Sequence, residues 1–144
     1  MSFLLDTNVV SEWTKPQPDR HVVSWLDAAD EDQLFLSVAS FAEIRLGIEN
    51  MPKGRRRERL RAWLDDDLAV RFENRTIAID RVIAETWGVI VNRAKRVGAT
   101  VGSIDAFFAA TAEVRGLTLV TRNVRDFRTL GIAIFNPWDA QAET

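Results

Sequence analysis

Short apolar runs alternate with longer segments of helical periodicity along the whole chain. Five runs have the length and composition of strands, at residues 3–5, 34–38, 76–79, 117–121 and 133–135. Helical patterns fill the spaces between them, at residues 19–29, 41–49, 60–68, 83–97 and 106–114. Such alternation predicts a parallel sheet covered by helices on both faces, that is, an α/β fold.

The clearest helical pattern runs over residues 83–97. Its apolar side chains recur every three or four positions, which is typical of a helix with one buried face: Ile83, Trp87, Ile90, Ala94 and Val97. The corresponding positions of the earlier segments are Val22, Val23 and Leu26, then Phe41, Ile44 and Ile48, then Leu60, Trp63, Leu64 and Leu68. Loops are expected at residues 50–54 and 96–103, which carry Pro and Gly. No repeat or linker interrupts the pattern, so we expect a single domain over residues 1–144.

Acidic or amide side chains stand where the predicted strands end or the helices begin. Asp6 closes the first strand, Glu43 opens the helix after the second, and Asp105 opens the most apolar helix. Asn123 and Asp126 follow the fourth strand. A buried strand tolerates a carboxylate poorly unless something pairs with it, so this recurrence needs an explanation.

Helix capping explains these residues when each is taken singly. Ser40 and Glu43 fit the S-x-x-E capping box. Ser103 could cap the helix that follows it, and Asn123 could pair with Asp126 in the same way. Acidic groups in a first turn also interact favourably with the helix dipole.

A shared site explains the same residues when they are taken together. In open parallel sheets, ligands bind outside the carboxyl ends of the strands. Several carboxylates meeting there would repel one another, so the arrangement would need a cation. Oxygen ligands without His or Cys favour Mg²⁺ or Mn²⁺ over zinc. Such an ion polarises a phosphoryl oxygen and lowers the pKa of bound water, so the joint pattern predicts phosphoester chemistry.

Composition narrows the possible classes of protein. The 144-residue chain has no cysteine, which excludes a disulfide framework, a thiolate zinc site and a thiol nucleophile. Its net charge of -2 does not by itself indicate nucleic-acid binding. The N-terminal residues form no signal peptide, and no apolar run is long enough to cross a membrane. We therefore expect a cytoplasmic protein without membrane association.

One basic segment allows two interpretations. "KGRRRERLR" at residues 53–61 holds six cations and one anion, so it could contact RNA phosphates. It could equally form a solvated helix face, on which Arg61 would pair with Asp65 one turn later.

Other conspicuous residues are assigned structural roles. His21 is far in sequence from the acids above, so we expect it on the surface or in packing, which also argues against a Ser-His-Asp triad. Asp80 is expected to cap the helix after it, and the triplet "DDD" at 65–67 to lie on the surface. The five Trp residues are expected in core or dimer packing.

Five short motifs between residues 3 and 138 form a specific set: "LLDTNVVSE", "SVASFAEIRLGIE", "DAFFAATA", "LVTRNVRDF" and "FNPW". In this order they resemble PIN-domain proteins of the VapC type, the toxins of bacterial toxin–antitoxin pairs, and especially the FitB-like branch. The resemblance implies a three-layer α/β/α fold with a central parallel sheet. It also implies a Mg²⁺- or Mn²⁺-dependent ribonuclease that cuts RNA with an activated water. The partners implied are a small VapB- or FitA-like antitoxin and a second copy of the chain, and the resemblance leaves open a larger assembly with antitoxin on DNA.

The resemblance also assigns site residues. Asp6, Glu43 and Asp105 match three acidic positions of the family site, and each would be a metal ligand. At a fourth position the family has an acid either where Asn123 stands or three residues later, where Asp126 stands. We take Asp126 as the fourth metal ligand and Asn123 as a polar helper.

Two further polar residues and two rival functions complete the prediction. Thr121 would orient water or a ligand through its hydroxyl, and Asn8 would brace the loop around Asp6.

A first rival function is a phosphatase that uses Asp6 as a covalent nucleophile. Such enzymes need a second Asp two residues after the nucleophile, and this chain has Asn8 there, which disfavours the phosphatase. The other rival is a module that binds RNA or a partner without catalysis. A pure scaffold would have no reason to retain mutually repelling acids, which disfavours it.

Overall fold

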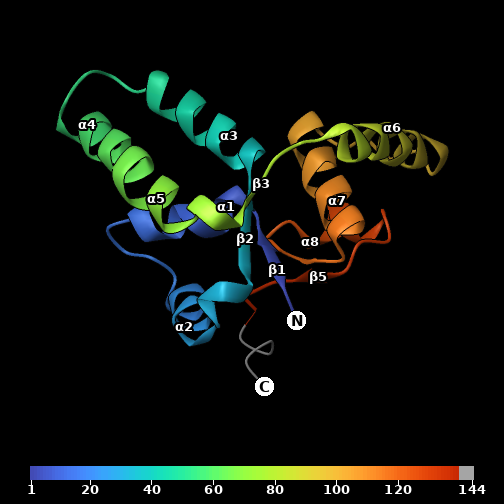
Figure 1. Cartoon of the computed structure of the whole chain (residues 1–144), viewed down its shortest axis with the longest axis horizontal. Helices are drawn as coiled ribbons and strands as arrows, with labels where there is room; N and C mark the ends of the chain where they lie inside the picture. Colours follow the sequence, from blue (N-terminus) through green and yellow to red (C-terminus); the bar gives the residue numbers. More distant parts are fainter. Residues whose placement is uncertain (140–144) are drawn as a thin grey trace.

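A five-stranded parallel sheet forms the centre of the protein in a computed structural model that describes residues 1–139 (Figure 1). The strands are β1 (Phe3–Leu5), β2 (Leu34–Ser37), β3 (Thr76–Ile77), β4 (Thr118–Val120) and β5 (Ile134–Phe135). Their order in the sheet is β3-β2-β1-β4-β5, and each neighbouring pair is parallel. All five predicted strands are present, and the predicted α/β class is confirmed.

Helices connect each strand to the next. The α-helices are α1 (Thr7–Val10), α2 (Arg20–Ala28), α3 (Val38–Glu49), α4 (Arg55–Ala62), α5 (Ala69–Arg71), α6 (Arg81–Arg96), α7 (Ser103–Arg115) and α8 (Val124–Arg128). The described residues also include 3₁₀ turns η1 (Ser11–Thr14), η2 (Glu31–Gln33) and η4 (Glu73–Arg75), and a π-helical segment η3 (Trp63–Leu68). The five predicted helical segments all form. Helices α1, α5 and α8 lie outside the predicted segments, because helices this short leave no periodic pattern.

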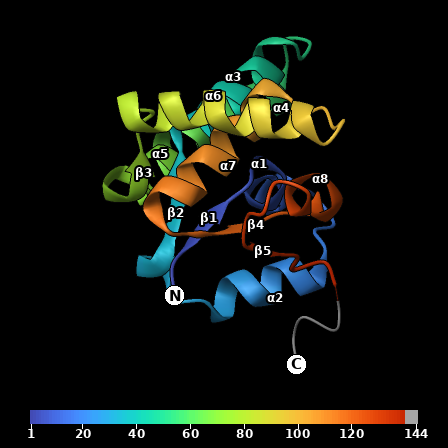
Figure 2. The same ribbon diagram turned by 90° about the vertical axis from the view of Figure 1, so that its right-hand side faces the viewer.

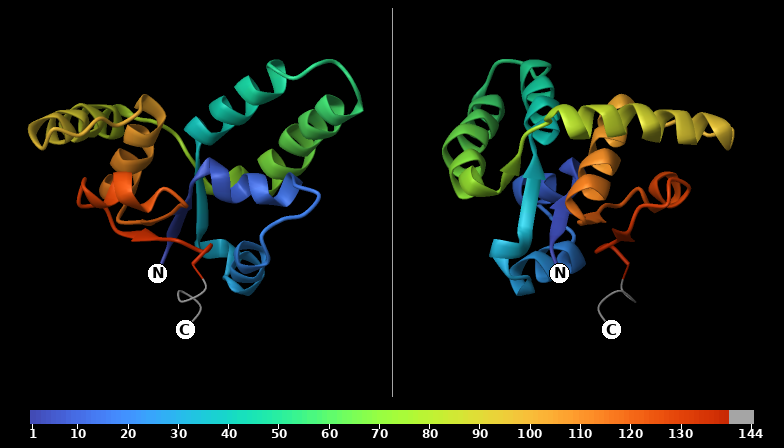
Figure 3. Two further views of the ribbon diagram at one scale, coloured as in Figure 1. Left: turned by 180° about the vertical axis from the view of Figure 1, so that it is seen from behind. Right: turned by 45° about the vertical axis from the view of Figure 1, so that its right-hand side comes forward.

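The sheet separates two apolar cores, because neighbouring residues of a strand point to opposite faces. Leu4 and Leu119 pack with α6, α7 and α8 on one face. Leu5 and Val120 pack on the other face, against α1, α2, α3 and η3. Figure 3 shows α3 to α5 on the opposite side of the sheet from α6 and α7, and Figure 2 shows α6 lying across α7. The predicted three-layer α/β/α architecture is therefore confirmed.

Burial along α6 follows the predicted face with one exception. Ile83, Ile90 and Ala94 are buried, whereas Val97 is 63% exposed. Helix α6 ends at Arg96, so Val97 already lies in its C-cap and no longer on the buried face. No helix among residues 1–139 is long and apolar enough to span a membrane.

The surface charges agree with the sequence only in part. Asp80 caps α6 as predicted, since its Oδ1 accepts a hydrogen bond from the N–H of Ile83 at 2.9 Å. The acidic triplet at 65–67 is exposed, also as predicted. The predicted pair of Arg61 with Asp65 is wrong. Helix α3 lies beside α4, so Asp65 instead pairs with Arg45 of α3, at 2.7 Å.

Candidate active site

A cavity of about 420 Å³ opens at the carboxyl edge of the sheet, beyond β1 and β4. The strand order reverses between these two strands, and open α/β sheets bind ligands at such a position. Neither His21 nor the acidic triplet at 65–67 reaches it. The residues that line the cavity are Asp6, Thr7, Asn8, Ser11, Lys15, Glu43, Asp105 and Asn123.

Asp6 directly follows β1 and is only 5% exposed. Its Oδ2 accepts hydrogen bonds from the Thr121 hydroxyl at 2.7 Å and from the Asn8 amide at 3.4 Å. Burial raises the pKa of Asp6 from 3.8 to about 6; the Thr121 hydrogen bond opposes this rise, and the carboxylates of Asp105 and Glu43 add to it. Asp6 is therefore a buried acid whose ionised form is destabilised until a cation compensates it.

Thr121 links the ends of the neighbouring strands β1 and β4. It is fully buried, its hydroxyl donates to Asp6, and the same oxygen accepts a hydrogen bond from the N–H of Asn123 at 2.9 Å. The hydroxyl was expected to orient water or a ligand. Because its proton is committed to Asp6, Thr121 positions that carboxylate instead. Asn8, predicted to brace the loop around Asp6, contacts the Asp6 carboxylate through its amide.

Glu43 reaches the cavity from the second turn of α3. The predicted capping box of Ser40 with Glu43 is wrong, because the helix already begins at Val38 and Ser37 caps it. Glu43 Oε1 instead accepts a hydrogen bond from the Thr7 hydroxyl at 2.6 Å, and the Ser40 hydroxyl lies 3.0 Å from the same Thr7 oxygen. Glu43 is thus held toward the other acids rather than toward its own helix terminus.

Asp105 stands half buried in the first turn of α7. The predicted cap at Ser103 is wrong: the helix begins there, and Gly102, which has no side chain, occupies the N-cap position. Burial raises the pKa of Asp105, and the carboxylates of Glu43 and Asp126 raise it further. Asp105 therefore lies within electrostatic reach of acids from α3 and α8.

Asn123 and Asp126 are the two candidates for the fourth position of the predicted site, and the structure places them differently. Asn123 lines the cavity and occupies the N-cap position of α8, where its side chain makes no capping hydrogen bond. Asp126 lies in the first turn of α8, outside the cavity lining but near enough to raise the pKa of Asp105. The capping role proposed for Asn123 is therefore wrong, and its side chain faces the cavity instead.

Thr7, Ser11 and Lys15 also line the cavity but were missed in the sequence. Thr7 could have been found from the sequence, because it directly follows Asp6 in the "LLDTN" motif. Lys15 lies outside every predicted strand and helix, so the sequence pattern did not point to it. Lys15 forms an ion pair with Glu12, a buried carboxylate that also accepts a hydrogen bond from the N–H of Asp19 at 2.9 Å. The pair holds one cation beside an otherwise acidic cavity.

The donor set suits a hard divalent cation that keeps part of its water shell. Among residues 1–139, no three His, Cys, Asp or Glu side chains converge as a ready-made metal cage. Mg²⁺ commonly binds through one or two carboxylates and retains several waters, so it needs no such cage. Three carboxylates around an open cavity fit that mode of binding. The Oδ1 of Asn8 is buried and has no hydrogen-bond partner among residues 1–139.

Comparison with known proteins identifies one family and a consistent group of relatives. Residues 3–132 match the PIN domain. The chain is 38% identical over 95% of its length to the plasmid stability protein StbB of Pseudomonas syringae pv. tomato, of which it covers 99%. It is 36% identical over 94% of its length to the toxin FitB of Neisseria gonorrhoeae, of which it covers 97%. With the VapC ribonuclease Y4jK of Sinorhizobium fredii it shares 35% identity over 94% of its length, covering 97% of that protein.

Solved structures give the same result. A structure of FitAB bound to an IR36 DNA fragment superposes with a TM-score of 0.89 at 34% identity, covering 95% of this chain and 96% of that one. The structure of FitAcB from Neisseria gonorrhoeae also gives 0.89, at 36% identity and with 94% and 98% of the two chains covered. Together, the fold, the acidic cavity at the strand ends and these relatives show that the chain belongs to the PIN-domain family, in its FitB-like branch.

Proposed function

We propose that this protein is a Mg²⁺- or Mn²⁺-dependent endoribonuclease and the toxin of a toxin–antitoxin pair. The observation that carries the proposal is the buried Asp6, whose pKa of about 6 reflects burial and the nearby carboxylates of Asp105 and Glu43. Gathering these acids costs the fold stability, and a divalent cation would remove the repulsion. Relatives named as a toxin and as a VapC ribonuclease support the same activity.

Asp6, Glu43 and Asp105 would hold the metal ion, with Asn123 beside them in the cavity lining. When bound, the ion supplies a positive charge that polarises the phosphoryl oxygen and favours ionisation of a water. The chain's own contribution is to hold the carboxylates in place. The hydroxyl of Thr121 fixes Asp6, and that of Thr7 fixes Glu43. Such preorganisation reduces the reorganisation needed during the reaction.

Lys15 and Asp126 would adjust the charge around this site. An RNA phosphate approaches a cavity lined by acids, so it needs a neighbouring cation, and Lys15 is the cation in the cavity lining. Asp126 would act on the site through Asp105, whose pKa it raises, or by binding the ion through a water. In the second role it would be the further carboxylate predicted from the sequence.

We further propose that a small antitoxin inhibits the enzyme. Two similar structures, FitAB on a DNA fragment and FitAcB, contain the Fit system to which the related toxin FitB belongs. An antitoxin arginine that enters the cavity would pair bidentately with Glu43 or Asp105 and take the place of the cation. A homodimer of the toxin, and its assembly with antitoxin on DNA, belong to the same proposal.

Cleavage of a single-stranded RNA by the purified protein tests the activity. We expect cleavage with Mg²⁺ or Mn²⁺, none in EDTA, and none by Glu43→Gln in either buffer. Asp80→Asn, which changes an exposed capping carboxylate outside the cavity, is the matched control and should cleave like wild type. Cleavage that continues undiminished in EDTA would overturn the metal mechanism.

The same preparation separates the two rival functions. A protein that binds RNA or an antitoxin but never cleaves with either metal would be a non-catalytic module. A phosphatase would instead form a phosphoaspartate at Asp6. The amide of Asn8 cannot serve it as an acid or base, because it neither gains nor loses a proton near neutral pH.

A further inference from the structure

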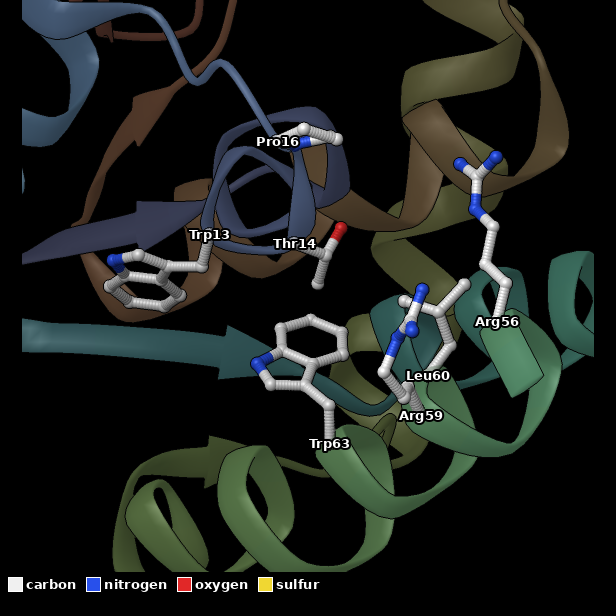
Figure 4. A pocket seen from close by; sticks show the side chains of 7 residues that line it. All are labelled: Trp13, Thr14, Pro16, Arg56, Arg59, Leu60 and Trp63. Atoms are coloured by element: carbon white, nitrogen blue, oxygen red, sulfur yellow. The ribbon is translucent and has the colours of Figure 1, made fainter.

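A second cavity, of about 360 Å³, lies beside the acidic one. Its lining combines aromatic and basic side chains, shown in Figure 4: Trp13, Thr14, Pro16, Arg56, Arg59, Leu60 and Trp63. One wall comes from the segment around η1, and the other from α4 and the start of η3. We refer to these seven residues as the tryptophan–arginine pocket.

The tryptophan–arginine pocket and the acidic cavity share one wall. Within residues 11–16, Ser11 and Lys15 line the acidic cavity, whereas Trp13, Thr14 and Pro16 line the pocket. A chain molecule whose phosphate lies at the acids could therefore continue over this segment into the pocket.

Helix α4 presents one face to the pocket. Arg56, Arg59, Leu60 and Trp63 follow the spacing of three and four residues that places side chains on one side of a helix. The arginines of the basic run at 53–61 therefore lie on different faces of α4. Its residues Arg57 and Arg61 pair with Glu49 of α3, whereas Arg56 and Arg59 are exposed and form no ion pair among the described residues.

The two tryptophans of the pocket differ in how they are held. Trp13 packs against Phe72, with ring centroids 6.3 Å apart, and the guanidinium of Arg71 lies 4.4 Å from the Trp13 ring centroid. Trp63 has no aromatic partner among the described residues and is half buried, with its indole directed into the pocket (Figure 4). Trp13 is therefore a fixed wall, and Trp63 offers ring surface to a ligand.

We propose that the tryptophan–arginine pocket binds one unpaired nucleotide of the RNA substrate, next to the nucleotide whose phosphate is cleaved. The proposal rests on the ribonuclease function proposed above. An unpaired base would stack on Trp63, because every base has a flat π-face. Arg59 and Arg56 would bind the adjoining phosphate, for which the guanidinium fork is well suited. These unpaired cations also offset the repulsion between RNA and the acidic cavity.

Binding of RNA in EDTA, measured by fluorescence anisotropy, tests the pocket without cleavage. The probe is a fluorescein-labelled single-stranded RNA of about ten nucleotides, a length within the range of known single-strand sites. We expect Trp63→Leu to weaken binding about 5- to 100-fold, which corresponds to the loss of one stacked base. Trp63→Phe keeps a stacking surface and should stay within about threefold of wild type. The same RNA annealed to its complement should bind wild type, Trp63→Leu and Trp63→Phe with equal affinity, because its bases are paired.

Salt dependence tests the arginines separately. Arg59→Gln should reduce the slope of log affinity against log salt by about 0.7, the value for one phosphate contact to a single strand. Arg115→Gln is the matched control: Arg115 is likewise exposed without an ion pair among the described residues, but it lies beside Ser2 at the opposite edge of the sheet. It should leave the slope unchanged. Both arginines are on the surface, so the comparison does not depend on core packing.

Two results would overturn the proposal. In one, Trp63→Leu and Arg59→Gln bind RNA like wild type while wild type cleaves RNA with Mg²⁺; the ribonuclease function then stands and the nucleotide pocket fails. In the other, the two variants keep RNA binding but lose binding to the antitoxin, which makes the pocket a protein-binding site. A third result separates the two proposals. If both variants lose RNA binding but the wild-type protein does not cleave RNA with either metal, the RNA contact is supported and the enzyme function is overturned.

Discussion

Removing the charge of Asp6 should stabilise the metal-free protein. Asp6→Asn deletes the ionisable group while keeping the size of the side chain and an oxygen that can accept the Thr121 hydrogen bond. In the folded protein, burial, with smaller contributions from Asp105 and Glu43, raises the pKa of Asp6 from 3.8 to about 6. A pKa difference of roughly two corresponds to about 3 kcal/mol of folding free energy.

The gain should appear only where the wild-type carboxyl is ionised. An acid whose pKa is higher in the folded than in the unfolded state contributes stability below its unfolded pKa, and this contribution is lost as pH rises through the folded pKa. For Asp6 the loss extends from 3.8 to about 6. Wild type and Asp6→Asn should therefore be similar at about pH 4, and at about pH 7.5 the variant should be more stable by up to about 3 kcal/mol.

Thermal unfolding in EDTA at the two pH values measures this difference. At about 2–4 °C per kcal/mol, Asp6→Asn should melt roughly 6–12 °C above wild type at the higher pH. Asp80→Asn is the control, because Asp80 is an exposed N-cap residue and Asn caps helices about as well as Asp. If Asp6→Asn melts below wild type at the higher pH, or if the gap does not shrink toward the lower one, burial and like charges are not what destabilises this carboxylate.

Two further predictions concern metal binding and the positioning of Glu43. At about ten times its dissociation constant, Mg²⁺ should stabilise wild type by about 1.4 kcal/mol, which raises the melting temperature by roughly 3–6 °C. Asp105→Asn should lose most of this Mg²⁺-dependent shift and all cleavage, and in EDTA it should melt no lower than wild type. A variant that melts lower in EDTA yet keeps the shift would show that Asp105 stabilises the start of α7 and does not bind the metal. Thr7→Val removes the hydroxyl that Glu43 accepts from, and initial cleavage rates should fall about tenfold or more, as expected when a charged group loses a hydrogen bond. Thr7→Ser keeps the hydroxyl and should retain most activity, so equal rates for the two variants would exclude a positioning role.

The sequence by itself determined the elements of this fold and the family. Strand and helix patterns depend on residues close together in the chain, so the five strands and the α6 face from Ile83 to Ala94 could be predicted from periodicity. The same holds for the cap at Asp80, which contacts a backbone group only three residues away. Asp6, Glu43 and Asp105 could be selected as candidates because each follows a predicted strand or opens a predicted helix, and parallel sheets bind ligands at the carboxyl ends of their strands.

Only the tertiary structure decided which polar groups contact one another. Thr121 and Asp6 are 115 residues apart, and they meet because β1 and β4 are neighbours in the sheet. The capping box at Ser40 failed because α3 already begins at Val38 with Ser37 as its cap. Glu43 instead accepts a hydrogen bond from Thr7, which another element, α1, brings beside it. Side-chain contacts between distant segments follow from strand order and helix packing, which no local pattern records. For that reason the acidic cavity and the tryptophan–arginine pocket became visible only in the folded chain.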